Sequence, residues 1–305
     1  MQTAESNRKY KILFVDDEPR ITAALNAIFR REYTVFTANS GAQALALLEQ
    51  QNVDVVVSDQ RMPKMLGNQL LAQISKTFPQ TMRILLTGFT DRAAIVDSIN
   101  EGEIYRFINK PWRNDELKEV IAEAALASEN SVEAVSSSAP ESDVDRALLM
   151  VESSEGVRNQ IRRISKRDNI MVYGTQNLEQ AVAAGVQRES IGVMIFGFAY
   201  RPKPTLEAIH ALKRARPDLV TIVLAQEYDT QIAIDLINQG QVHKYLVLPL
   251  EEEMLAITVS EAFRKHYFLK HNQTAQIRYK VETRSGRIIS GLQEVFSRLV
   301  GSATS

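Results

Sequence analysis

The sequence predicts an α/β protein with two doubly wound domains, each built on a five-stranded parallel sheet. Short apolar runs rich in valine, isoleucine and leucine alternate with segments of helical periodicity. This alternation is typical of parallel sheets that are covered by helices on both faces. The same order of elements starts again after a serine-rich stretch near the middle of the 305 residues. A chain of this length is expected to contain two domains, or three.

Five strand–helix pairs are expected in the first half. The strands are β-branched and short, whereas the helices place apolar residues three or four positions apart. We expect strands at 12–15, 35–38, 53–57, 83–86 and 105–108, and helices at 21–28, 42–50, 70–76, 93–100 and 116–127. Right-handed crossovers between the parallel strands then give a doubly wound fold.

The second half repeats the pattern of the first. Residues 229–240 match residues 91–102 at an offset of 138, and Pro249 follows Pro111 at the same offset. Further runs match the first, third and fourth strands, at 148–151, 192–196 and 221–224. A constant offset over a long region indicates a second copy of the same fold.

These patterns divide the chain into four parts. A first α/β domain is expected at 8–128, a linker at 129–145, a second α/β domain at 146–265 and a tail at 266–305. Serine, proline and acidic residues dominate the linker, a composition that buries little surface. The tail is basic and expected to be mainly helical, because its apolar residues fall on one helical face. Alternation within 276–283 leaves a strand open there.

Composition excludes several classes of function. The chain has no cysteine, which excludes disulfides, cysteine–zinc sites and cysteine catalysis. Its formal net charge of −1 gives no sign of a nucleic-acid partner. No apolar stretch approaches the ~18–20 residues that span a bilayer, and the N-terminus lacks the apolar core of a signal peptide. We therefore expect a cytoplasmic protein without a membrane or nucleic-acid partner.

Charged and hydroxyl side chains stand at the ends of four predicted strands in the first half. They are Asp16 with Asp17, Asp59, Thr87 and Lys110. In a doubly wound sheet, ligands bind at the carboxyl ends of the strands. Three carboxylates in one crevice repel one another unless one takes up a proton or a cation is bound. Oxygen ligands without histidine or cysteine suit Mg²⁺.

Asp59 is the best-placed nucleophile of this set, because it stands alone at the end of the central strand. A carboxylate that attacks phosphorus forms an acyl phosphate. Mg²⁺ and the Lys110 ammonium would stabilise charge on the phosphoryl oxygens. The Thr87 hydroxyl could donate a hydrogen bond to one of those oxygens.

With these residues in place, residues 10–127 resemble the receiver domain of two-component response regulators. The resemblance implies a flavodoxin-like fold, Asp59 as phosphoacceptor, Lys110 as its catalytic partner, and a switch formed by Thr87 and Phe107. It also implies Mg²⁺ bound by Asp16, Asp17, Asp59 and the backbone carbonyl of Arg61. Residues 58–63 and 105–112 resemble a subgroup of receivers whose partners handle cyclic dinucleotides or regulate transcription.

The second copy departs from this pattern. At the offset of 138, the positions of Asp59, Thr87 and Lys110 hold Gly197, Ala225 and Leu248. Its first strand ends in a single acid, Glu152, where the first copy has two. We therefore expect a degenerate, receiver-like domain that is not phosphorylated and serves in binding.

The resemblance implies a response regulator of a phosphorelay. A histidine kinase or phosphotransfer protein would supply the phosphoryl group, and altered protein–protein contacts of the second domain and tail would carry the signal to an effector. We expect a homodimer, and no enzymatic activity beyond self-phosphorylation and slow autodephosphorylation. Two alternatives stay open: a phosphohydrolase with an aspartyl-phosphate intermediate, and a phosphate sink for a histidine kinase.

Overall fold

The structure of the protein is a computed structural model. This structure describes residues 9–88, 100, 104–129, 146–152, 154–197, 202–227, 229–240, 242–272 and 275–276. The chain divides into two compact units, Met1–Val132 and Glu133–Ser305, and each is described by itself. Within the described residues, no helix is long and apolar enough to cross a membrane.

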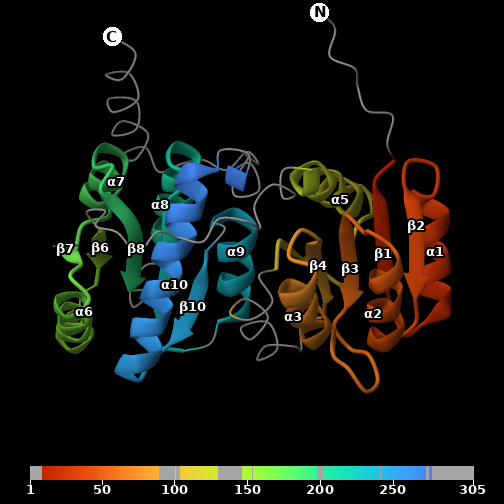
Figure 1. The fold of residues 1–305 in the computed structure, drawn as a ribbon, viewed down its shortest axis with the longest axis horizontal. Coiled ribbons are helices and arrows are strands. Elements are labelled where there is room, and N and C mark those ends of the chain that lie inside the picture. The colour runs from red at the N-terminus through yellow and green to blue at the C-terminus, as the bar shows by residue number, and fades with distance from the viewer. Residues whose placement is uncertain are drawn as a thin grey trace, which may run out of the picture. The chain divides into compact units, whose positions relative to one another are not determined.

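The first unit contains a five-stranded parallel sheet (Figure 1). Its strands are β1 (Lys11–Val15), β2 (Thr34–Ala38), β3 (Val55–Asp59), β4 (Met82–Thr87) and β5 (Arg106–Asn109). Their order in the sheet is β2-β1-β3-β4-β5. β3 is buried along its whole length, which explains its run of valines because the central strand of such a sheet meets helices on both faces.

Helices cover both faces of this sheet. They are α1 (Pro19–Phe29), α2 (Gly41–Gln50), α3 (Gly67–Thr77) and α5 (Asn114–Glu129). α1 and α5 share one apolar core with the strands, and α2 packs against α3. Local signals fix two helix starts: Pro19 occupies the first turn of α1, and the Ser40 side chain caps α2 by accepting from Gln43 N–H. The helix expected at 93–100 lies outside the described residues except for Asn100, which is helical.

The second unit repeats this architecture. Its strands are β6 (Ala147–Val151), β7 (Met171–Thr175), β8 (Ile191–Gly197), β9 (Val220–Ala225) and β10 (Lys244–Val247). The order β10-β9-β8-β6-β7 is the order of the first sheet read from the opposite edge. Its helices are α6 (Glu155–Arg167), α7 (Leu178–Gln187), α8 (Pro202–Ala215), α9 (Thr230–Gly240) and α10 (Glu252–His271). α6 and α10 share a core with one face of the sheet, and α7, α8 and α9 pack in sequence against one another.

The strand registers of the two sheets agree pair by pair. Asp59 is paired with Leu86 in the first sheet and Gly197 with Leu224 in the second, an offset of 138 residues on both strands. The backbone bond from Lys110 N–H to the Thr87 carbonyl recurs from Leu248 N–H to Ala225, at the same offset. The prediction of two flavodoxin-like α/β domains is therefore confirmed.

The last helix differs from the expected division of the chain. α10 runs to His271, beyond residue 265, where the sequence suggested the end of the second domain. Leu269 lies in the core of this unit, and burying such a side chain contributes about 1.5–3 kcal/mol. Ala275 and Gln276 are also helical. The remainder of the tail, 277–305, lies outside the described residues, so the helix or strand expected there is not tested.

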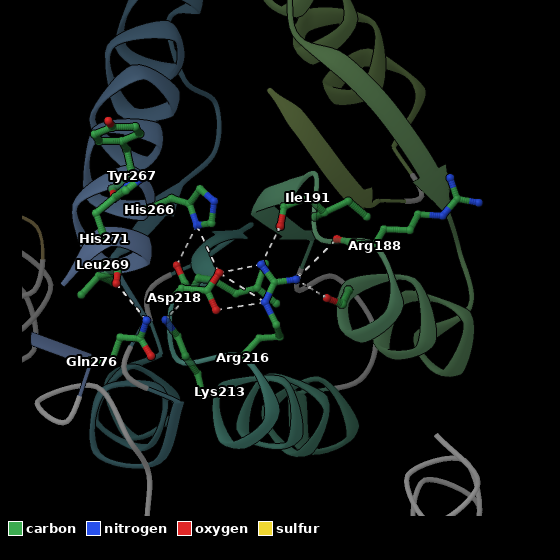
Figure 2. Close-up of polar contacts among 12 residues, drawn as sticks. Arg188, Ile191, Lys213, Arg216, Asp218, His266, Tyr267, Leu269, His271 and Gln276 are labelled. Carbon is green, nitrogen blue, oxygen red and sulfur yellow. Dashed lines mark hydrogen bonds and ion pairs between the residues drawn. The ribbon is translucent and has the colours of Figure 1, made fainter. Parts of the chain in front are cut away.

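A buried polar cluster joins the start of β9 to α8 and α10 (Figure 2). The Arg216 guanidinium donates to the Asp218 carboxylate and to the backbone carbonyls of Gly185 and Ile191. Burial alone would raise the pKa of Asp218, but the hydrogen bond and charge of Arg216 lower it below its usual value. His266 contacts the Asp218 backbone carbonyl through Nδ1 at 2.9 Å. Arg216 therefore ties several backbone segments of this unit to one buried carboxylate.

Candidate functional site

The first unit gathers its acidic side chains where β1 and β3 end. Asp16 and Asp17 follow β1, and Asp59 is the last residue of β3. The two strands are neighbours, with Val15 paired to Ser58, so their carboxyl ends open on the same edge of the sheet. Asp16 and Asp59 are buried and Asp17 is half-buried.

These three carboxylates form a candidate cation site. Asp16, Asp17 and Asp59 each offer one oxygen, and the three atoms lie within 4.8 Å of one another. No other group of three acids or histidines that close was found among the described residues. An all-oxygen set of carboxylates fits Mg²⁺.

Lys110 supplies a positive charge to the same crevice. It directly follows β5, and its Nζ lies 2.7 Å from Asp59 Oδ1 and 3.4 Å from Asp16 Oδ2. The ammonium is thus shared between the acids from two strands. Such charge-assisted contacts are about twice as strong as neutral hydrogen bonds.

The pKa values of the pocket reflect this crowding. Burial raises the pKa of Asp16, and the Asp59 charge adds to the effect, whereas Glu18 N–H and Lys110 oppose it. Burial by itself would lower the pKa of Lys110, but the hydrogen bond and charge of Asp59, together with Asp16, raise it above its ordinary value. Lys110 is therefore held as a cation beside the carboxylates.

Thr87 and Phe107 lie on the adjoining strands. Thr87 ends β4, is fully buried, and donates from its hydroxyl to the Gly88 carbonyl at 3.3 Å. Phe107 lies in β5 and is buried. Thr87 is paired with Asn109, two residues beyond Phe107. The two residues therefore lie on neighbouring strands, Thr87 at the end of β4 and Phe107 within β5.

The backbone of Arg61 lies beside the Asp59 carboxylate. Its N–H donates to Asp59 Oδ2 at 3.2 Å, while its side chain is exposed. The role of the Arg61 carbonyl as a metal ligand stays a prediction. Asp16, Asp17, Asp59, Arg61, Thr87 and Lys110 thus lie at the carboxyl ends of β1, β3, β4 and β5 or within two residues of them, whereas Phe107 lies inside β5.

Other residues that shape the pocket were missed from the sequence. A Cβ on Gly67, at the start of α3, would lie 2.1 Å from the Asp59 carbonyl oxygen, so only glycine lets α3 approach the end of β3 this closely. Asn39 Nδ2 donates to the Asp16 carbonyl at 2.9 Å. Gln60 exchanges hydrogen bonds with Asn68 through its side chain. The glycine was visible in the sequence, but nothing local indicated the close approach.

The second unit lacks this chemistry at the matching positions. Gly197 ends β8, Ala225 ends β9, and Leu248 directly follows β10. Leu248 instead packs against the apolar core. Glu152 follows β6 as Asp16 follows β1, and it is buried. The second sheet therefore keeps the register of the first without the carboxylate of Asp59, the hydroxyl of Thr87 or the ammonium of Lys110.

Several known proteins are similar to this chain. Residues 12–122 match the family described as the response regulator receiver domain. The sporulation initiation phosphotransferase F of Bacillus subtilis is 33% identical over 113 residues, covering 36% of this chain and 90% of that protein. The hydrogenase transcriptional regulatory protein HoxA of Cupriavidus necator is 31% identical over 219 residues, covering 67% of this chain and 43% of that protein.

Among solved structures, the signal receiver domain of an HD domain-containing protein from Pseudomonas fluorescens is 38% identical. It covers 44% of this chain and all of that domain, with a TM-score of 0.42. The chain spans less than half the length of the hydrogenase regulators that it matches.

A doubly wound sheet with three carboxylates and a lysine at its carboxyl edge defines a receiver domain, and the family match covers the same residues. The chain belongs to the response-regulator family, with a receiver as its first domain and a second five-stranded parallel α/β domain.

Proposed function

We propose that the chain is a phosphorelay response regulator that accepts a phosphoryl group on Asp59. The observation that carries the proposal is the Lys110 ammonium, 2.7 Å from Asp59 Oδ1, at the edge where Asp16 and Asp17 also converge. A carboxylate held beside a fixed cation is suited to a reaction that brings negative charge to the site.

The chemistry assigned to Asp59 is a phosphoryl transfer. Its carboxylate oxygen forms a bond to phosphorus while the bond between phosphorus and the donor's imidazole nitrogen breaks, and that electron pair stays with the imidazole. Mg²⁺, held by Asp16, Asp17, Asp59 and the Arg61 carbonyl, would neutralise charge on the phosphoryl group. Lys110 would pair with a phosphoryl oxygen, and the Thr87 hydroxyl would turn from the Gly88 carbonyl to donate to another.

Thr87 alone would not switch the domain. A charge-assisted hydrogen bond contributes about 1.5–3 kcal/mol, whereas moving a two-state equilibrium from 1:99 to 99:1 takes about 5.5 kcal/mol. We propose that Lys110 and the metal contribute the rest. Phe107 would then repack in the space that Thr87 leaves, which would remodel the face formed by β5 and α5.

The second domain is proposed to be a degenerate receiver that transmits the signal through protein contacts. The repeated strand register and the replacement of the reactive residues by Gly197, Ala225 and Leu248 support this role. We propose domains at 8–128 and 146–271, joined by the linker 129–145 and followed by the basic tail. The second boundary is moved from 265 to 271 because α10 extends that far.

The proposed partners are those of the class. Receiver domains work with histidine kinases or phosphotransfer proteins, and we propose one of these as the phosphoryl donor, a downstream effector protein as the target, and a homodimer as the signalling form. The similar hydrogenase regulator is named a transcriptional regulatory protein. We do not extend nucleic-acid binding to this chain, because the matched region covers less than half of that protein.

The proposal is tested by incubating the full chain with acetyl phosphate and Mg²⁺ and following the mass gain of a phosphoryl group. We expect labelling of the wild type, loss of labelling with a chelator, and no labelling of Asp59→Asn. Asp115→Asn is a matched control, because this aspartate lies on α5 with an exposed side chain. Labelling of Asp59→Asn at the wild-type rate would contradict the proposal. Steady turnover of a phosphomonoester that is lost in Asp59→Asn would favour the phosphohydrolase alternative instead.

A further inference from the structure

We call the carboxyl edge of the second sheet, with Glu152, Gly197, Ala225 and Leu248, the degenerate pocket. Among these four residues Glu152 is the only acid, and it is buried. It follows β6 as Asp16 follows β1, because Val151 is paired with Phe196 as Val15 is paired with Ser58. The local turn is also the same. Asp16 Oδ1 accepts from the backbone N–H two residues further on at 2.9 Å, and Glu152 Oε1 does so at 2.7 Å.

The difference lies in where the second carboxylate oxygen ends. A Cβ built on Gly197 would lie 1.9 Å from Glu152 Oε2 and 2.4 Å from its Cδ. Non-bonded atoms do not approach this closely, so a side chain at 197 would require the buried Glu152 carboxylate, the end of a flexible side chain, to shift from its present place. In the first unit that space belongs to the side chain of Asp59, because Asp59 and Gly197 hold the same register position.

The extra methylene of glutamate explains the reach. Asp16, one carbon shorter, coexists with Asp59 at the end of the neighbouring strand. Gly197 has no positive φ, so its backbone does not demand glycine and the requirement is one of space. The glutamate at one strand end and the absence of a side chain at the other therefore belong to one steric arrangement.

We infer that Glu152 is an internal substitute for the phosphoacceptor: its carboxylate fills the position that the side chain of Asp59 holds in the first unit, and a side chain at 197 must displace it. The inference rests on the proposed role of the second domain as an unphosphorylated receiver. It adds a cause to that role, because restoring an aspartate at 197 alone would overlap the Glu152 carboxylate. The role of Glu152 in this inference is steric, and no reaction is assigned to its carboxylate.

A double-mutant cycle on the full chain tests this inference. The chains are the wild type, Gly197→Ala, Glu152→Asp and the double variant. Readouts are the unfolding temperature of the second unit and amide exchange of β6 and β8 by mass spectrometry. In the wild-type background we expect Gly197→Ala to displace the Glu152 carboxylate from its bond to Ser154 N–H, and so to lower the unfolding temperature by a few degrees and to speed exchange by roughly threefold to tenfold. If neither readout changes, the inference is overturned. In the Glu152→Asp background, we expect most of this cost to disappear.

Two controls separate the steric effect from others. Glu152→Gln keeps the shape and removes the charge, so Gly197→Ala should stay costly beside it. Gly174→Ala places a Cβ on β7 at an ordinary 3.8 Å from Met150, so its effect should be small and independent of residue 152.

An equal cost of Gly197→Ala in both backgrounds would overturn the inference, and so would a failure of Gly197→Ala to fold in both. A variant that folds only beside Glu152→Asp supports it. Phosphorylation of Asp59 is measured on the same chains. Its absence from the wild type would contradict the proposed function and leave the outcome of the cycle unaffected.

Discussion

The carboxyl edges of the two sheets have the same strand order and register but carry different charged side chains. In the first, Lys110 Nζ lies 2.7 Å from Asp59 and 3.4 Å from Asp16, and one oxygen from each of Asp16, Asp17 and Asp59 lies within 4.8 Å of the others. In the second, the strands keep the same register, but glycine, alanine and leucine stand at the reactive positions. The same strand order and register therefore form without the charged edge, so the fold does not depend on those charges.

The largest expected effect is the loss of Lys110. Lys110→Met should reduce the rate of Asp59 phosphorylation by about 100-fold, the order of magnitude for removing one donor to a developing oxyanion. Lys118→Met, an exposed lysine on α5, should leave the rate unchanged. Rates are followed by intact mass with acetyl phosphate. A reduction of less than about threefold in Lys110→Met would contradict the role given to this ammonium, since one such donor is expected to contribute far more.

Mg²⁺ binding should depend on Asp16, which follows β1, and should not depend on Glu152, which follows β6. Asp16→Asn should weaken Mg²⁺ binding by roughly 30-fold, since a charge-assisted interaction contributes about 2 kcal/mol. Glu152→Gln should not change it. Trp112 is the only tryptophan, and its ring centroid lies 5.7 Å from Lys110 Nζ, so its fluorescence is a suitable readout. Equal effects of the two substitutions would mean that the second pocket also takes up the metal.

Two glycines test how tightly the phosphoacceptor strand is packed. Gly67→Ala should destabilise the first unit by about 1–3 kcal/mol, because its Cβ would collide with the Asp59 backbone. Gly156→Ala, near the start of α6 with no atom closer than 4.0 Å, should stabilise the second unit by up to about 1 kcal/mol. Urea unfolding measures both. A neutral Gly67→Ala would show that α3 can move away from β3 without cost.

The pH dependence of the second unit should trace to Lys213. Burial lowers the pKa of Lys213 from 10.5 to about 7, with Lys265 adding to the effect and Asp218 opposing it. Between these values the unfolded chain carries the proton and the folded chain does not. Stability should therefore rise with pH from about 7 to about 10.5, by at most about 1.4 kcal/mol per pH unit.

Lys213→Met should remove this slope, measured by amide exchange of α8 and β9 between pH 7 and 9. Lys203→Met, exposed on the same helix, should retain it. The same slope in both variants would assign the pH dependence to another group.

Much of the first site could be predicted from the sequence, because its residues follow strands that are themselves marked by apolar runs. Asp59, Thr87 and Lys110 each lie at or directly after the end of such a run. The strand containing Asp59 begins at Val55, two residues later than expected, and includes the aspartate itself. Asp59 is therefore part of the sheet, and its backbone is paired with Leu86 of β4.

What could not be predicted depends on contacts between distant segments. The close approach of Gly67 to Asp59 joins a helix start to a strand end. The reach of Glu152 toward Gly197 crosses from β6 to β8. The sequence alone showed only that one acid remained at 152. The boundary expected at 265 lies inside α10, which continues to His271, and the burial of Leu269 that accompanies this extension depends on the sheet that the helix covers.

We propose that this chain, with two copies of the fold, carries a single phosphoacceptor. The most direct measurement is the number of phosphoryl groups on the wild-type chain after exhaustive reaction with acetyl phosphate and Mg²⁺, mapped by peptide mass spectrometry. We expect one group per chain, on the peptide that contains Asp59, and none within 146–271. A second group in that range, or a single group located there, would contradict it.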